Sequence, residues 1–155
     1  MILCLRKVLY ASAIALSAAL LFAVEPAAAK SLLPKFGGAA GVWIASILFF
    51  QVTLLAGYLY AYTLTRFVSA RAQLWVHTLL LATSIFLLPW VPAGAGAMAG
   101  EHPLGRILLA LASSIGLPFF ALSSTTPLLQ AWYGEGAPYR LFALSNAASL
   151  AALLA

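Results

Sequence analysis

The chain has 155 residues, of which 65% are hydrophobic and only 7% are charged, and its formal net charge is +5. A water-soluble domain carries about 25% charged residues, so this composition excludes an ordinary soluble globule. The basic residues are scattered singly or in pairs, which gives no support for a nucleic-acid partner. The lone cysteine, Cys4, excludes an intrachain disulfide and a multi-cysteine metal site.

The apolar stretches predict an all-α, multi-pass transmembrane helix bundle that forms a single domain over residues 1–155. A membrane span needs about 20 apolar residues, and the chain has room for about four complete spans plus the start of a fifth. These spans are expected near residues 8–24, 42–64, 74–91, 104–132 and 142–155. The last stretch is too short to cross and has no closing Gly, Pro or charge, so it is interpreted as a helix that is cut short. The lipid bilayer and other membrane helices are the expected partners.

The first stretch has two interpretations. It follows Arg6 and Lys7 and precedes three alanines at 27–29, a pattern that secretory signal peptides share. We interpret it as a first transmembrane helix, because the connection behind it, residues 25–41, carries the family motif described below. This connection is rich in Pro and Gly and is expected to be non-helical.

The second stretch, Val42–Leu64, contains 23 residues without a formal charge and is predicted to be one continuous helix. Its aromatic residues suit the membrane interfaces: Trp43, Tyr60 and Tyr62. Gln51 lies near the bilayer midplane, where a polar amide needs a partner, so it is expected to turn toward another protein helix. A contact with a substrate is the alternative. Asn146 in the last stretch is interpreted in the same way.

The third stretch contains His77, and the only other histidine, His102, falls in a loop. Without a second histidine at a pairing position, no haem, metal or other cofactor is expected. His77 is therefore interpreted as an interfacial or hydrogen-bonded residue, with a pigment or metal ligand as the alternative.

The fourth stretch is long for one span and contains Pro118 and Pro127, each of which removes a backbone donor. A kink or local unwinding is predicted between Ser114 and Pro127. The hydroxyls of residues 123–126 are expected to bond the freed carbonyls. A broken, ligand-binding helix of the transporter type is the alternative.

The distribution of Lys and Arg predicts a cytoplasmic N-terminus. With that orientation five basic residues lie inside: Arg6, Lys7, Arg66, Arg71 and Arg140. Three lie outside: Lys30, Lys35 and Arg106.

Several motifs follow one another in a distinctive order: Glu25-Pro26-x-x-x-Lys30-x-x-Leu33-Pro34, then Leu54-Leu55-Ala56-Gly57-Tyr58, and later Pro138-Tyr139-x-Leu141-Phe142-Ala143. From Glu25 onward the chain resembles the N-terminal membrane region of the bacterial spermidine-synthase-like proteins, also described as fused transporter/spermidine synthases. This resemblance implies a bacterial cytoplasmic (inner) membrane protein that acts in small-molecule handling or transport. A non-catalytic accessory subunit of a larger bioenergetic or photosynthetic membrane complex is the alternative function.

The charged motif positions are candidate binding residues. Glu25, Lys30 and Lys35 match charged positions of the family motif, and a Glu beside a Lys at a membrane edge suits a zwitterionic or anionic group. Helix capping, pairing with each other or contact with lipid headgroups are the alternatives. Gln51 completes the candidate set, and neither a catalytic nor a metal-binding residue is expected.

We expect the 155-residue chain not to transfer aminopropyl groups, because this chemistry needs clustered carboxylates to hold a cationic amine. The three acidic residues, Glu25, Glu101 and Glu135, lie in separate parts of the sequence. The test incubates purified protein with decarboxylated S-adenosylmethionine and putrescine and measures spermidine, with a soluble aminopropyltransferase as positive control. Turnover that persists after contaminating synthases are removed would contradict this expectation.

Overall fold

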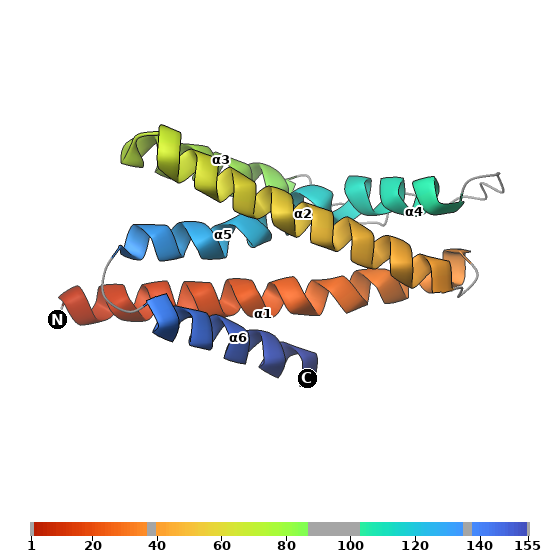
Figure 1. The fold of residues 1–155 in the computed structure, drawn as a ribbon, viewed down its shortest axis with the longest axis horizontal. Helices are drawn as coiled ribbons and strands as arrows, with labels where there is room; N and C mark the ends of the chain where they lie inside the picture. The colour runs from red at the N-terminus through yellow and green to blue at the C-terminus, as the bar shows by residue number, and fades with distance from the viewer. Residues whose placement is uncertain (1, 37–39, 87–102, 135–137, 155) are drawn as a thin grey trace.

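The computed structural model describes residues 2–36, 40–86, 103–134 and 138–154, and every element within these ranges is a helix (Figure 1). The helices are α1 (Ile2–Phe36), α2 (Ala40–Phe67), α3 (Ala70–Phe86), α4 (Pro103–Leu111), a π-helical segment η1 (Ala112–Gly116), α5 (Leu117–Tyr133) and α6 (Pro138–Leu154). The predicted all-α architecture is confirmed. Residues 87–91 of the third predicted span, and Glu101, His102 and Glu135, lie outside the described residues.

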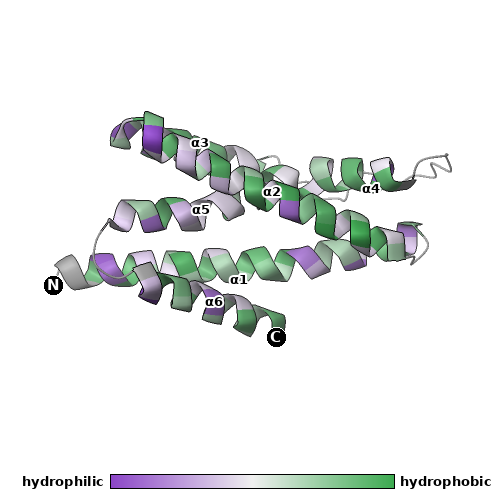
Figure 2. Ribbon diagram, viewed as in Figure 1, coloured by the Kyte–Doolittle hydropathy of each residue, from purple (hydrophilic) through white to green (hydrophobic). Residues whose placement is uncertain are grey.

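Among the described residues, three helices are long and apolar enough to cross a membrane: Leu5–Phe36, Ala40–Phe67 and Leu104–Tyr133. Figure 2 shows that most residues along α1 and α2 are hydrophobic, a pattern typical of helices that face lipid or other helices rather than water. Large apolar side chains such as Leu55 and Ile44 are accordingly exposed on the bundle surface. α6 is apolar but shorter.

The first helix is longer than predicted. α1 does not end at residue 24 but continues through Pro26 and Pro34 to Phe36, so the expectation of a non-helical connection is wrong for residues 25–36. Each proline removes one backbone donor, but alanine, the strongest helix former, follows Pro26. The added turns also bury Leu32 in a core cluster with Phe50 of α2. Such burial, together with the absence of competing water in a membrane, favours the continuous helix.

The fourth predicted span is one helical rod with an internal irregularity. η1 lies directly before Pro118, and its wider turn is a common way for a membrane helix to accommodate a missing donor. The predicted irregularity between Ser114 and Pro127 is thus found only at its start, in the π-helical turn that ends at Gly116, and α5 continues through Pro127 without a break. The hydroxyls of Ser124 and Thr125 bond the carbonyls of Phe120 and Ala121. They do not bond the carbonyls of Ser114 and Ser123 that the prolines leave free.

α5 is the central helix of the bundle. The most extensive helix–helix contacts join α1 to α6, α2 to α5 and α1 to α5. α1 and α2 thus lie on either side of α5, and α6 covers the other side of α1 (Figure 1). Aromatic packing holds α2 to α5, with the rings of Phe50 and Phe119 only 4.6 Å apart between centroids.

α2 and α5 approach each other most closely at Gly57. A Cβ atom placed there would fall onto Ser123 Oγ and lie 3.1 Å from the backbone nitrogen of Ser124. Both serines are fully buried, with exposed fractions of 1% and 0%. Small residues at a membrane helix interface allow such close packing.

We expect Gly57→Ala to lower the free energy of unfolding by about 1–3 kcal/mol, because the added methyl group overpacks the α2–α5 contact. Thermal unfolding in mild detergent measures this change. Gly41→Ala in the same helix and Gly105→Ala in α4 are matched controls, since a Cβ at either position meets nothing within 4 Å. Both controls should be neutral or slightly stabilising, as alanine is the better helix former. Equal stability of all three variants would contradict the close approach.

Candidate functional site

A cavity of about 300 Å³ lies between α1, α2 and α6. Three of its lining residues offer polar or cation-binding groups, namely Glu25, Trp43 and Ser46. The remaining lining is apolar: Phe22, Pro26, Ala29, Ile47 and Leu153. Such a volume lies at the lower end of the range for small-ligand pockets, which combine mainly apolar walls with a few polar groups.

Helical spacing explains why these residues share the cavity. On α1 the lining residues recur at helical intervals, from Phe22 through Glu25 and Pro26 to Ala29, and therefore occupy one face. On α2 Trp43 and Ser46 follow the same rule. The continuation of α1 beyond residue 24 is therefore what directs Glu25 into the cavity, whereas the predicted non-helical connection would have left its direction open.

Glu25 is the only acidic residue in the cavity lining, and its side chain is half-buried. It lies eleven residues before the end of α1, in a helix that is long and apolar enough to cross a membrane. A carboxylate in such a position needs a positive partner or a proton. The lining residues include no Lys, Arg or His.

The structure does not bring Glu25 together with the two lysines, contrary to the grouping that the motif suggested. Lys30 and Lys35 are both exposed. At 3.6 residues per turn they lie about 140° and 80° away from Glu25 around the axis of α1. A joint site for a zwitterionic group is therefore not formed, because the segment is helical and points the three side chains in different directions.

Ser46 supplies an unused polar atom to the cavity. Its side chain is 1% exposed, and its Oγ has no hydrogen-bond partner in the described structure. The hydroxyl of Thr53 in the same helix, by contrast, bonds the carbonyl of Phe49 at 2.8 Å. The oxygen has almost no accessible surface, so a ligand could reach it only after the surrounding side chains move, and it is one of the rare buried polar groups without a partner.

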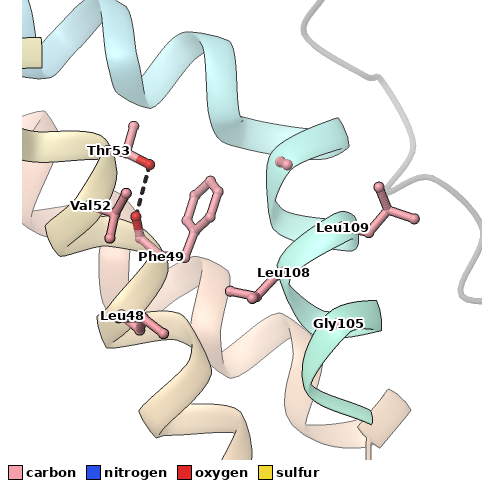
Figure 3. A pocket seen from close by; sticks show the side chains of 8 residues that line it. Leu48, Phe49, Val52, Thr53, Gly105, Leu108 and Leu109 are labelled. Carbon is pink, nitrogen blue, oxygen red and sulfur yellow. Dashed lines mark hydrogen bonds between the residues drawn. The ribbon is translucent and has the colours of Figure 1, made fainter. Parts of the chain in front are cut away.

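Gln51 lies away from this cavity, on the outer surface of α2. Its side chain is exposed, so the prediction that it turns toward another helix is wrong for the helices described in this chain. A second, larger cavity of about 490 Å³ lies between α2 and α4, and Gln51 is not among its lining residues (Figure 3). The lining of that cavity is apolar except for Thr53, whose hydroxyl is engaged with Phe49. This second cavity offers no group for binding a polar ligand.

His77 belongs to a polar cluster that joins α3 to α5. Its Nε2 lies 3.1 Å from Thr125 Oγ1. Because Thr125 donates its own proton to a carbonyl of α5, Nε2 acts as the donor. A second bond crosses between the same helices, from Trp132 Nε1 to Gln73 Oε1 at 2.6 Å. His77 is thus hydrogen-bonded and buried inside the bundle rather than at the interface.

Tyr60 also turns inward, although the sequence suggested an interfacial position. Its ring packs against Phe120, with centroids 5.4 Å apart, and lies 6.2 Å from the ring of His77. Tyr62 keeps an exposed position. The cluster around His77 therefore serves mainly to hold α3 against α2 and α5.

Sequence reasoning found Glu25 but missed Trp43 and Ser46 as its neighbours. The only indication in the sequence was the spacing of these two residues, which places them on one face of the second span. Nothing in the sequence identified which face of α1 would meet them.

Comparison with protein-family models, curated proteins and solved structures found no match to this chain. Within the described residues, no three His, Cys, Asp or Glu side chains come close enough to hold a metal ion together. The chemistry of the Glu25 cavity is therefore the main guide to function.

In the ligand-free protein we expect Ser46→Ala to be neutral or to raise the free energy of unfolding by up to about 1 kcal/mol, since it removes a buried hydroxyl without a partner. Ser17→Ala is the matched control. Ser17 is also buried, but its Oγ donates to the carbonyl of Leu122 in α5 at 3.2 Å. Its loss should cost about 1 kcal/mol. Detergent unfolding compares the two variants, and a larger loss at Ser46 would show that its hydroxyl is engaged in the free protein.

Proposed function

We propose that this protein is a membrane-embedded helix bundle that binds a small cationic amine in the Glu25 cavity, as part of small-molecule handling or transport. The observation that carries the proposal is a half-buried carboxylate and an unpaired buried hydroxyl lining one cavity without any basic residue. A ligand with positive charge and hydrogen-bond donors complements both groups.

A primary ammonium group suits this lining in three ways. Its N–H groups can donate to the carboxylate of Glu25 in a charge-assisted bond, and to the hydroxyl oxygen of Ser46 once the side chains that cover this oxygen move. The indole of Trp43 offers a cation–π contact. The apolar remainder of the wall suits the methylene chain of an alkylamine. An anionic ligand would instead meet an uncompensated carboxylate.

The resemblance to the membrane region of spermidine-synthase-like proteins agrees with this ligand class. Amines are the substrates of the soluble domain that commonly follows that region. Glu25 is a position of the family motif, so the residue that carries the charge here is also one that the resemblance selects.

The arrangement of basic residues supports a bacterial cytoplasmic membrane protein with its N-terminus inside. Figure 1 shows the start of α1, the junction of α2 and α3 and the start of α6 at one end of the bundle. The five basic residues that the topology places on the cytoplasmic side belong to these segments. The end of α1 and the starts of α2 and α4 lie at the other end. Under this topology α3 is a fourth span and α6 begins a fifth.

We expect the purified protein in detergent or nanodiscs to bind spermidine and n-butylamine, measured by calorimetry. Glu25→Gln should weaken binding about 10- to 150-fold, because a hydrogen bond to a charged group contributes about 1.5–3 kcal/mol. Lys30→Gln is the control, since Lys30 lies on a different face of α1 and should leave the affinity unchanged.

Two results would contradict the proposal. One is absence of saturable amine binding by the wild-type protein, and the other is equal affinity of the wild-type protein and Glu25→Gln. A third result would be tighter binding of an anion than of an amine, with the anion binding abolished by Lys30→Gln. This result would instead favour a binding site that includes the lysines of the sequence motif.

A further inference from the structure

No cation lies beside Glu25 among the residues that line its cavity. On α1 itself, Lys30 is the next charged residue, and it lies about 140° away around the helix axis. α2 and α6 face Glu25 across the cavity, and none of the side chains that they contribute to the lining is an acid or a base: Trp43, Ser46, Ile47 and Leu153. The described lining therefore offers nothing to balance a negative charge on Glu25.

The exposed part of Glu25 borders apolar surface. Its side chain is half-buried, and three of the residues that share the lining are large apolar side chains with exposed fractions of 39%, 50% and 56%: Phe22, Ile47 and Leu153. In a membrane such side chains face lipid rather than water. A carboxylate with neither water nor a cation around it is costly, and a carboxyl group that keeps its proton avoids this cost.

The cavity lies close to one end of the bundle. Trp43 and Ser46 are three and six residues from the start of α2 at Ala40, or about 5 Å and 9 Å along the helix axis. The position of Trp43 suits the membrane interface, where water is present. A proton or an amine from this water has only a short distance to travel to Glu25.

From these observations we propose that Glu25 binds a proton and a cationic amine in exchange for one another. The inference rests on the proposed function, since it concerns the same cavity and the same amine. In the empty cavity Glu25 is a neutral carboxylic acid. When an ammonium group enters, the O–H bond of Glu25 breaks, the proton leaves to water, and the carboxylate pairs with the ammonium. One positive charge enters and one leaves, so the cavity is neutral in both states.

The exchange makes protons competitors of the amine. Where one proton is released for each amine bound, the affinity for the amine rises about tenfold for each unit by which the pH increases. At a pH where Glu25 is already ionised in the free protein, no proton is released and the affinity no longer depends on pH. A site of this kind couples the release of an amine to the uptake of a proton.

Calorimetry of the purified full chain in detergent or nanodiscs counts the released protons. The ligand is n-butylamine, which stays an ammonium ion between about pH 5.5 and 8, because alkylamines lose their proton near pH 10. Binding is measured in phosphate and in Tris, two buffers that differ in their enthalpy of protonation. We expect the heat to differ between the buffers by the equivalent of about one proton per bound amine at the acidic end of this range. The affinity should rise about tenfold per pH unit there.

Two variants identify the source of the proton. Glu25→Gln has no carboxyl group, so its weaker amine binding should release no proton and should not change with pH. Lys30→Gln is the matched control on the same helix and should keep the proton release and the pH dependence of the wild-type protein. The comparison of buffers needs only the wild-type protein, so it also holds where a variant does not fold.

Two results would overturn the exchange and leave the amine site intact. One is amine binding by the wild-type protein with the same heat in both buffers and an affinity that does not change with pH. The other is proton release that persists in Glu25→Gln, since the proton would then come from another group. A wild-type protein that binds no amine at any pH would overturn the proposed function and the exchange together.

Discussion

The close approach of α2 and α5 at Gly57 is the contact on which the rest of the bundle depends. Only the absence of a side chain at Gly57 lets the backbone of α2 come near Ser123 and Ser124, which are fully buried. α5 then occupies the centre, and its other side meets α1, where Ser17 donates to a carbonyl of α5. In a membrane, where lipid tails compete equally for apolar surface, such van der Waals packing and interhelical hydrogen bonds replace the hydrophobic effect as the source of association.

The hydroxyl-rich part of α5 shows how a polar sequence is accommodated inside this bundle. Ser124 and Thr125 direct their hydroxyls to carbonyls of their own helix, which satisfies the hydroxyls without opening the helix. The hydroxyl of Thr125 also accepts a hydrogen bond from His77 of α3. The same polar segment therefore bonds carbonyls within α5 and connects α5 to α3. The polar residues that first suggested a broken transporter helix therefore act here as connections between intact helices.

Three buried polar atoms among the described residues have no hydrogen-bond partner: Ser46 Oγ, Tyr60 OH and His77 Nδ1. Ser46 also belongs to the lining of the cavity that contains Glu25. Gln51 lies exposed on the surface of the same helix. The two sites are separated by less than two helical turns but face different neighbours. α2 thus turns one face, with Ser46, toward the bundle interior and another, with Gln51, toward its surface.

The sequence alone determined the all-α class, the membrane location and the continuity of α2. These features follow from the hydropathy and length of each segment, which do not depend on the helices packed against it. It also identified Glu25 as a charge of interest. It did not determine the course of α1 through Pro26 and Pro34, since a proline's local cost is offset by burial of residues such as Leu32 that only the assembled bundle provides. Nor did it reveal that Gln51 faces outward and Ser46 inward. Apolar residues surround both α1 and α2, so no amphipathic periodicity distinguishes the faces of these two helices. The rotation of each helix about its axis is decided instead by close contacts, such as that of Gly57 with Ser123.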